Sequence, residues 1–256
     1  MKKRTHHEKL ITLFNRNSFN DDIVEFYKDR IKKLGVDLSI LDLGAGSGFV
    51  SKKLNELDCV KSIVAYDRDL DSLRELDDKQ YLKINKCCEG NQKKLPFDRG
   101  KFDVIICRFA SQSLKDIYRV LSSDGIFLYS DPVLTNLSKL VLNPIYKIRE
   151  DSFHGYMSYI ETIDILESVG FIPYLLRPYK FRYDSFQTFL NGIEDGFENS
   201  CEHTKEFSTI LKSKIEHAWR QLDIEVSRDM DLDNENLTFT YNMLDIASTK
   251  FKKRDA

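Results

Sequence analysis

Apolar residues recur at two different periods along the first half of the chain, and the two periods alternate. Between residues 21 and 34 they lie three and four positions apart, which predicts an amphipathic helix capped by Asn20 or Asp21 and ended by Gly35. Asp124-Gly125 predicts a turn before a strand at 126–130. Short segments with apolar residues predict strands at 38–43, 63–66, 83–88, 102–107 and 126–130, and the fourth of these contains a continuous β-branched run at 104–106. Helices are predicted between them at 49–57, 70–76 and 114–121. Such alternation predicts an α/β fold with a doubly wound, mainly parallel sheet covered on both faces.

The last hundred or so residues break this alternation. They predict a helix at 156–169, a strand at 171–183, a mainly helical stretch at 186–219 and a β-rich run at 237–249. We expect the two late strands to form an antiparallel hairpin at one edge of a seven-stranded sheet, with a helical cap inserted between them. The expected organisation is an N-terminal helical lid (1–35), a core (36–183), the inserted cap (184–236) and a last edge strand with a tail (237–256).

Composition and charge limit the class of protein. The 256 residues are 41% hydrophobic and 31% charged, and 39 Lys and Arg nearly balance 41 Asp and Glu, so the chain can bury a large core. This balance provides no electrostatic footprint for nucleic acid. No apolar run approaches the roughly 20 residues that cross a bilayer, and the basic start is not a signal peptide. Five cysteines without paired zinc spacing indicate a reduced, cytoplasmic protein. From the charge balance and the lack of a long apolar run we expect neither nucleic-acid nor membrane partners.

The strongest chemical signal is the segment around the end of the first strand, residues 40–48 (ILDLGAGSG). Its three glycines let the backbone approach a ligand without Cβ clashes, and the following helix presents unpaired N–H groups to an anion. A dinucleotide fingerprint needs a glycine where this chain has Phe49, so the spacing disfavours NAD. Asp67 ends the second strand about twenty residues later, where a carboxylate can accept both ribose hydroxyls. Asp69 could be the carboxylate that binds the ribose instead, and Asp67 could be a solvated residue at a strand end. Together, the glycine turn and the carboxylate predict a nucleoside ligand.

This segment and four later ones resemble the class I S-adenosylmethionine-dependent methyltransferases. Within that class the resemblance is to the type 11 small-molecule subgroup, which is related to the ubiquinone/menaquinone-biosynthesis C-methyltransferases. The later segments are 90–97 (GNQKKLPF), 102–110 (FDVIICRFA), 119–125 (RVLSSDG) and 149–154 (REDSFH). The resemblance implies the Rossmann-like fold of this class, with S-adenosylmethionine as cofactor and S-adenosylhomocysteine as product.

Carried over position by position, the resemblance implies a cofactor site at the strand ends. Asp67 would bind the ribose, and Asp42 would orient the loop or take the ammonium through water. Asn91 stands where the family usually has an Asp that accepts a hydrogen bond from the adenine amino group; its carbonyl can still accept, but without the charge. The other cofactor contacts implied are Gly44, Ala45, Gly46, Ser47, Gly48, Arg68, Gln92, Arg108 and Phe109.

The resemblance says less about which residues contact the methyl acceptor. Arg108 and Phe109 would line the methyl-bearing end, although Arg108 could instead form a surface salt bridge. His154 is the best-placed base because it lies in a polar connection beyond the fifth strand; it could also only bind substrate, or be a solvated loop residue. Arg108 and His154 are thus the candidate catalytic residues, and the candidate substrate-binding residues are Arg149, Asp151, His154 and Tyr156.

The loop after Ala110 is shorter than in typical relatives by roughly two helical turns, so no acceptor is carried over from the family. We expect a methyltransferase that acts on O, N or C of a small-molecule acceptor, as a monomer or homodimer. Two alternatives stay open: non-methyl chemistry on the same fold, such as cyclisation or decarboxylation, and a non-catalytic protein that keeps the nucleoside site. The sequence contains no His or Cys pair with ligand spacing and no carboxylate set of the kind that binds magnesium, so we expect no metal.

Overall fold

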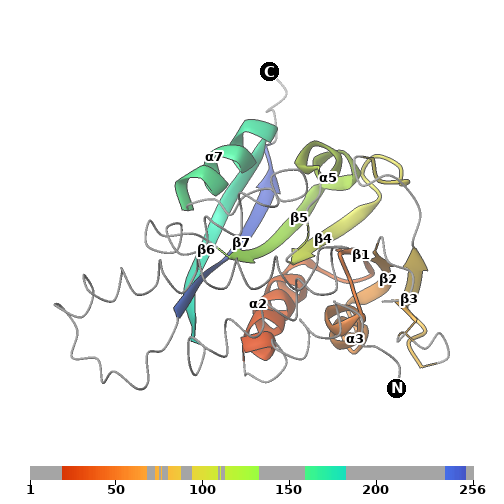
Figure 1. Ribbon diagram of the computed structural model, residues 1–256. Helices are drawn as coiled ribbons and strands as arrows, with labels where there is room; N and C mark the ends of the chain where they lie inside the picture. Colours follow the sequence, from red (N-terminus) through yellow and green to blue (C-terminus); the bar gives the residue numbers. More distant parts are fainter. Residues whose placement is uncertain are drawn as a thin grey trace, which may run out of the picture. The chain divides into compact units, whose positions relative to one another are not determined.

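The computed structural model describes residues 19–67, 73, 74, 76, 80–87, 94–108, 110, 113–132, 159–182 and 240–251 (Figure 1). The chain divides into two compact units. Most of the described residues belong to the unit formed by Asn17–Asp131, Tyr159–Pro178 and Leu244–Ala256. The predicted insertion at 184–236 lies outside the described residues.

Seven strands form one sheet in the order β3-β2-β1-β4-β5-β7-β6. Their bounds are β1 Leu38–Leu43, β2 Val60–Tyr66, β3 Ile84–Cys87, β4 Phe102–Arg108, β5 Leu121–Pro132, β6 Phe171–Arg182 and β7 Thr240–Lys250. The pairs among β1 to β5 are parallel, and the edge carries an antiparallel pair. This confirms the predicted doubly wound, mainly parallel Rossmann-like sheet.

The described helices are α2 Phe19–Leu34, α3 Phe49–Asn55, α5 Leu114–Val120 and α7 Tyr159–Val169. α2 contacts α3, and α5 contacts α7 (Figure 1). α2 begins at Phe19, so Asn20 and Asp21 lie inside the helix and the predicted cap was wrong, whereas the predicted stop before Gly35 is confirmed. None of these helices is long and apolar enough to cross a bilayer. The helix predicted at 70–76 falls largely outside the described residues.

The two central strands carry the core. β1 and β4 are adjacent, and their apolar side chains are buried on both faces of the sheet, as a continuous apolar run predicts. The fully buried members are Ile40, Leu41, Leu43, Val104, Ile105 and Ile106. Both strands run in the same direction, so β1 and β4 end together at one edge of the sheet.

The start of β5 differs from the prediction. Asp124-Gly125 lies within the bounds of β5 rather than before them. The register with β4 jumps between two neighbouring pairs, so residues 122–125 bulge opposite Asp103. A Cβ on Gly125 would lie 2.8 Å from the carbonyl oxygen of Asp103. The turn residues therefore form an irregularity inside the strand, where β4 and β5 approach closely.

Candidate functional site

The turn after β1 folds back onto the end of β2. The N–H groups of Gly44 and Ala45 donate to the carbonyl oxygen of Tyr66 at 2.9 and 3.1 Å. The N–H of Gly46 donates to Oδ2 of Asp67 at 2.8 Å, and Asp67 is only 8% exposed. Buried carboxylates of this kind are held by hydrogen bonds to backbone donors. The predicted glycine turn and the predicted ribose carboxylate therefore meet at one edge of the sheet.

A side chain at either of two glycines of this turn would meet a neighbouring residue. Gly44 and Gly48 have φ values of 70° and 75°, in the left-handed region that favours glycine. A Cβ on Gly44 would lie 2.4 Å from Cβ of Ala110, and one on Gly48 would lie 2.3 Å from Cδ2 of Leu76. The chain after β4 thus passes directly over the glycine turn at Ala110. These glycines serve packing as well as any approach of a ligand.

Asp42 is buried beneath the turn. Its side chain is near the end of β1, and its Oδ2 accepts a hydrogen bond from Oγ of Ser51 in α3 at 2.6 Å. Burial raises the pKa of Asp42 to about 6, although the Ser51 hydrogen bonds and the charge of Arg108 act in the opposite direction. The charge of Asp67 adds to the rise. Asp42 therefore ties β1 to the start of α3, next to the other charged groups of this edge.

Arg108 is the last residue of β4 and lies next to Ser130 of β5 in the strand register. Its Cζ is 5.5 Å from the centroid of the Phe49 ring, which begins α3. At this distance the guanidinium is attracted by the face of the ring. The Arg108 charge also acts on Asp42 and on Tyr27. A positive charge therefore stands at the carboxyl end of β4, beside the glycine turn.

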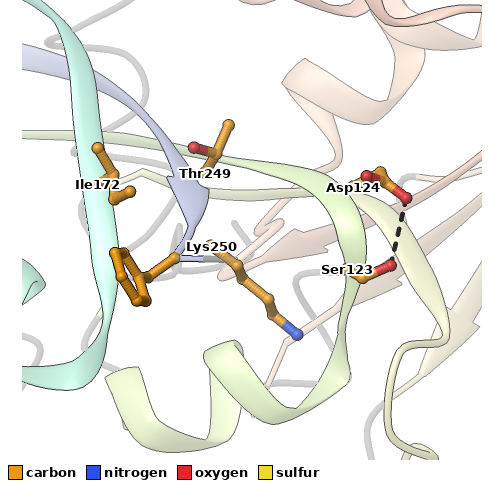
Figure 2. A pocket seen from close by; sticks show the side chains of 6 residues that line it. Ser123, Asp124, Ile172, Thr249 and Lys250 are labelled. Atoms are coloured by element: carbon orange, nitrogen blue, oxygen red, sulfur yellow. Dashed lines mark hydrogen bonds between the residues drawn. The ribbon is translucent and has the colours of Figure 1, made fainter. Parts of the chain in front are cut away.

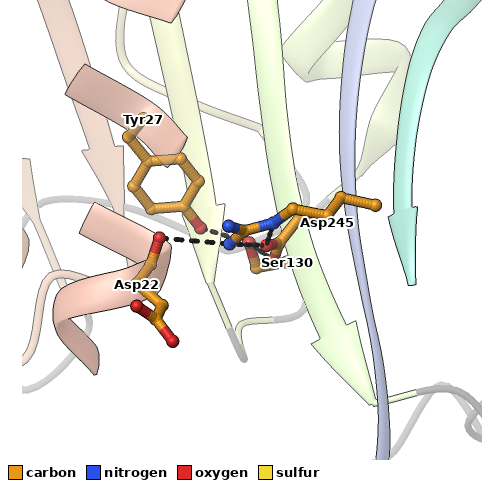
Figure 3. Close-up of polar contacts among 5 residues, drawn as sticks. Asp22, Tyr27, Ser130 and Asp245 are labelled. Carbon is orange, nitrogen blue, oxygen red and sulfur yellow. Dashed lines mark hydrogen bonds and ion pairs between the residues drawn. The ribbon is translucent and has the colours of Figure 1, made fainter. Parts of the chain in front are cut away.

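A buried hydrogen-bond network joins α2 to three strands at this edge (Figure 3). The hydroxyl of Tyr27 in α2 donates to Oγ of Ser130 at 2.5 Å, and Ser130 donates to Oδ1 of Asp245 in β7 at 2.6 Å. Nε of Arg177 in β6 donates to Oδ2 of Asp245 at 2.9 Å, and its Nη2 reaches the backbone carbonyl of Asp22 at 3.1 Å. Ser130 and Asp245 are fully buried.

The network fixes the protonation state of Tyr27. Burial first, and the charge of Asp245 second, raise the pKa of the Tyr27 phenol well above its ordinary value. Tyr27 is therefore a neutral hydrogen-bond donor at all physiological pH values. The apolar pattern of residues 21–34 includes Tyr27, but it did not reveal its partner Ser130, which lies 103 residues away along the chain.

A second cluster of hydrogen bonds holds the backbone of Leu95 and Phe97 to α5. The N–H of Leu95 donates to Oδ2 of Asp116 in α5, and Nη2 of Arg119 donates to the Leu95 carbonyl at 2.8 Å. Nη1 of Arg119 reaches the Phe97 carbonyl, and its Nε pairs with Asp116 at 2.6 Å. Residues 95–97 are thus held to α5, a contact that the sequence motif alone did not reveal.

Eight of the predicted site residues lie outside the described residues, and their assignments stay predictions. They are Arg68, Asn91, Gln92, Phe109, Arg149, Asp151, His154 and Tyr156. Of the candidate catalytic pair, the structure describes Arg108 alone. Within the described ranges, no three His, Cys, Asp or Glu side chains are grouped so that they could hold a metal ion.

A pocket of about 320 Å³ lies away from the glycine turn, at the end of the sheet where β5 begins (Figure 2). It is formed by the start of β5, the start of β6 and the end of β7, and is lined by Ser123, Asp124, Ile172, Thr249, Lys250 and Phe251. Ligands of doubly wound sheets bind outside the carboxyl ends of the parallel strands. The edge that carries the glycine turn, rather than this pocket, is therefore the candidate site.

Comparison with known families agrees with this geometry. A family model described as a methyltransferase domain matches residues 34–169, which is more than half of the chain. The chain belongs to this methyltransferase family. The match begins at the end of α2 and ends with α7, so it includes the glycine turn, Asp67, Arg108 and β5. No curated protein matches the chain.

Solved structures show the same fold at low sequence identity. The YcgJ protein from Bacillus subtilis is 17% identical, with a TM-score of 0.62, over 91% of this chain and 100% of that one. A SAM-dependent methyltransferase from Thiobacillus denitrificans in complex with S-adenosyl-L-homocysteine is 11% identical, with a TM-score of 0.56, over 98% and 100%. The [4+2]-cyclase SpnF is 12% identical, with a TM-score of 0.56, over 98% of both chains. The family match and this fold together place the chain in the class I methyltransferase family; the type 11 subgroup stays a prediction.

Proposed function

We propose that this protein transfers a methyl group from S-adenosylmethionine to O, N or C of a small-molecule metabolite. The observation that carries the proposal is the hydrogen bond of 2.8 Å between the Gly46 N–H and the Asp67 carboxylate. It holds the glycine turn and the carboxylate together at the carboxyl ends of β1 and β2. The strand order reverses between β1 and β4, and doubly wound sheets bind their ligands at such a point.

The described residues fit the cofactor. The backbone of the glycine turn can approach the amino-acid part closely, and a carboxylate such as Asp67 can accept several hydrogen bonds at once, including those of a ribose. Neutral or charged, Asp42 keeps the turn aligned with α3 through Ser51. When bound, S-adenosylmethionine supplies a methyl group on a sulfonium that is already a good leaving group. The protein then has mainly to align the acceptor and exclude water.

The remaining roles complete this proposal. Asn91 and the backbone N–H of Gln92 would bind the adenine, and Arg108 would line the methyl-bearing end of the site. His154 would act as a base or bind the acceptor. The other contacts proposed are Ala45, Ser47, Arg68 and Phe109 for the cofactor, and Arg149, Asp151 and Tyr156 for the acceptor. The acting form would be a monomer or homodimer in the cytoplasm, without a metal.

A second candidate is chemistry that uses the bound cofactor without consuming its methyl group. The observation that favours it is the similarity in fold to the [4+2]-cyclase SpnF over 98% of both chains. In that case S-adenosylhomocysteine would not accumulate during turnover.

Isotope labelling separates the two candidates. The protein is incubated with trideuteromethyl-labelled S-adenosylmethionine and a panel of phenols, amines, carboxylates and carbon acids, and products are analysed by mass spectrometry. The proposal predicts a labelled product together with an equal amount of S-adenosylhomocysteine, and predicts that Asp67→Asn lowers both. Converted acceptor without label or S-adenosylhomocysteine would support the second candidate instead.

A further inference from the structure

We propose that Asp131, at the end of β5, is the group that takes the proton from an acceptor methylated on O–H or N–H. The inference rests on the proposed function, because it assigns a base to that reaction. It differs from the expectation for His154, which rests on the place of that residue in a polar connection beyond the fifth strand.

The position of Asp131 in the sheet is the first argument. Ser130 pairs with Arg108, the last residue of β4, so Asp131 stands one position beyond the paired strand ends. It therefore lies at the edge where doubly wound sheets bind ligands. β5 is two strands from β1 in the sheet, which places its end roughly 10 Å from the glycine turn. A cofactor methyl group and a small acceptor can span that distance.

The neighbours of Asp131 are the second argument. Tyr129 is two residues earlier, so both side chains are on the same face of the strand, and the Tyr129 hydroxyl donates to Oδ2 of Asp131 at 2.6 Å. Tyr129 is paired in the register with Cys107 of β4, whose thiol donates to the Ala110 carbonyl at 3.1 Å. The cluster of Cys107, Tyr129 and Asp131 therefore adjoins the part of the chain that passes over Gly44.

The other described acids of this edge are engaged in holding the fold. Asp42 holds Ser51, Asp67 holds the glycine turn, and Asp245 is buried against Arg177 and Ser130. Cys107 is unsuitable as a base, because burial first, and the charges of Asp131 and Asp42 next, raise its pKa and keep the thiol protonated. Asp131 differs from these acids in two ways. It lies beyond the last paired residue of its strand, and its hydrogen bond comes from Tyr129 of the same strand rather than from another element.

The protonation behaviour of Asp131 suits the role. Burial raises its pKa to about 7, while the hydrogen bond from Tyr129 lowers it. A base whose pKa is near the working pH is the most effective kind. In the step, a lone pair of the acceptor O or N bonds to the methyl carbon, and the electron pair of the carbon–sulfur bond stays on sulfur. The acceptor proton passes to Asp131, which becomes neutral, and S-adenosylhomocysteine leaves.

The test compares the titration of Asp131 in two complexes of the whole protein. Carbon-13 NMR of labelled aspartate carboxyl groups is recorded against pH with saturating S-adenosylhomocysteine and then with S-adenosylmethionine. If Asp131 faces the reacting centre, the sulfonium charge lowers its titration midpoint by about one pH unit relative to the neutral product. An Asp131 that has a merely structural role does not sense this charge, and equal midpoints in the two complexes would overturn the proposal.

Three variants assign the signal. Asp131→Asn removes it, and Asp124→Asn, at the exposed opposite end of the same strand, leaves it unchanged. Tyr129→Phe raises its midpoint, because the hydrogen bond that favours the carboxylate is lost, so the assignment holds even if Asp131→Asn does not fold. Failure of both nucleosides to bind would refute the proposed function itself, which is a separate outcome. For an acceptor found by isotope labelling, Asp131→Asn should lower kcat by about 10²- to 10⁴-fold. Its affinity for S-adenosylmethionine should fall by no more than about tenfold, which is the reciprocal of the one-unit change in midpoint.

Discussion

Replacing Asp245 with alanine removes the centre of the network that holds α2 against the sheet. Asp245 is fully buried and accepts hydrogen bonds from Ser130 at 2.6 Å and from Nε of Arg177 at 2.9 Å. The substitution leaves the Ser130 hydroxyl buried without its acceptor, which costs about 1–3 kcal/mol. The Arg177 side chain is 37% exposed, so water replaces part of its lost ion pair, and this loss is limited to about 1 kcal/mol.

These two contributions predict that Asp245→Ala lowers the free energy of unfolding by about 2–4 kcal/mol. Asp245→Asn should cost less, because its amide oxygen can still accept from Ser130. The assay is urea denaturation followed by far-UV circular dichroism. Asp29→Ala is the control, since Asp29 is a carboxylate of α2 that pairs with Lys33 on the solvent-exposed side. A loss for Asp245→Ala no larger than that for Asp29→Ala would refute the reasoning.

Two further predictions concern the glycine turn and the buried acid Asp42. Gly44→Ala and Gly100→Ala share a φ of 70°, which costs about 1 kcal/mol for alanine, but only Gly44 faces a contact of 2.4 Å. Gly44→Ala should therefore be the less stable variant in urea denaturation and should bind S-adenosylmethionine more weakly; equal stability would contradict the contact with Ala110. Asp42 has a pKa of about 6 in the folded protein, against about 3.9 in the unfolded chain, so the folded state binds more protons between those values. Wild-type stability should fall by up to about 3 kcal/mol relative to Asp42→Asn as pH rises from about 4 to 6, whereas a constant difference between the two proteins would contradict a buried acid at this position.

The parts of the site that sequence reasoning predicted are those set by local pattern. Gly44, Gly46 and Gly48 are close neighbours after an apolar run, and Asp67 ends the next strand. Parallel neighbours bring the ends of β1 and β2 to the same edge, so strand order and spacing were enough to predict their meeting. The hydrogen bond between Gly46 and Asp67 agrees with this prediction.

The parts that were missed depend on contacts between distant segments. Ser130 and Asp245 are 115 residues apart, and Arg177 and Asp245 are 68 apart, so no local period links them. Asp245 and Ser130 also occupy positions in strands where an apolar pattern predicts only packing. Asp131 carries no signal in the sequence beyond its place at a strand end, since burial and the Tyr129 hydroxyl alone change its chemistry.

The most direct test of the central claim is calorimetric titration of the purified protein with S-adenosylmethionine and S-adenosylhomocysteine, with NAD as a control. The account predicts that both nucleosides bind and NAD does not, and that Asp67→Ala weakens binding by about 1–3 kcal/mol, the cost of losing a charged hydrogen-bond partner. Asp124→Ala, which changes an exposed carboxylate at the opposite edge, should leave the affinity unchanged. No heat from either nucleoside, with the protein folded and free of copurified ligand, would contradict the account.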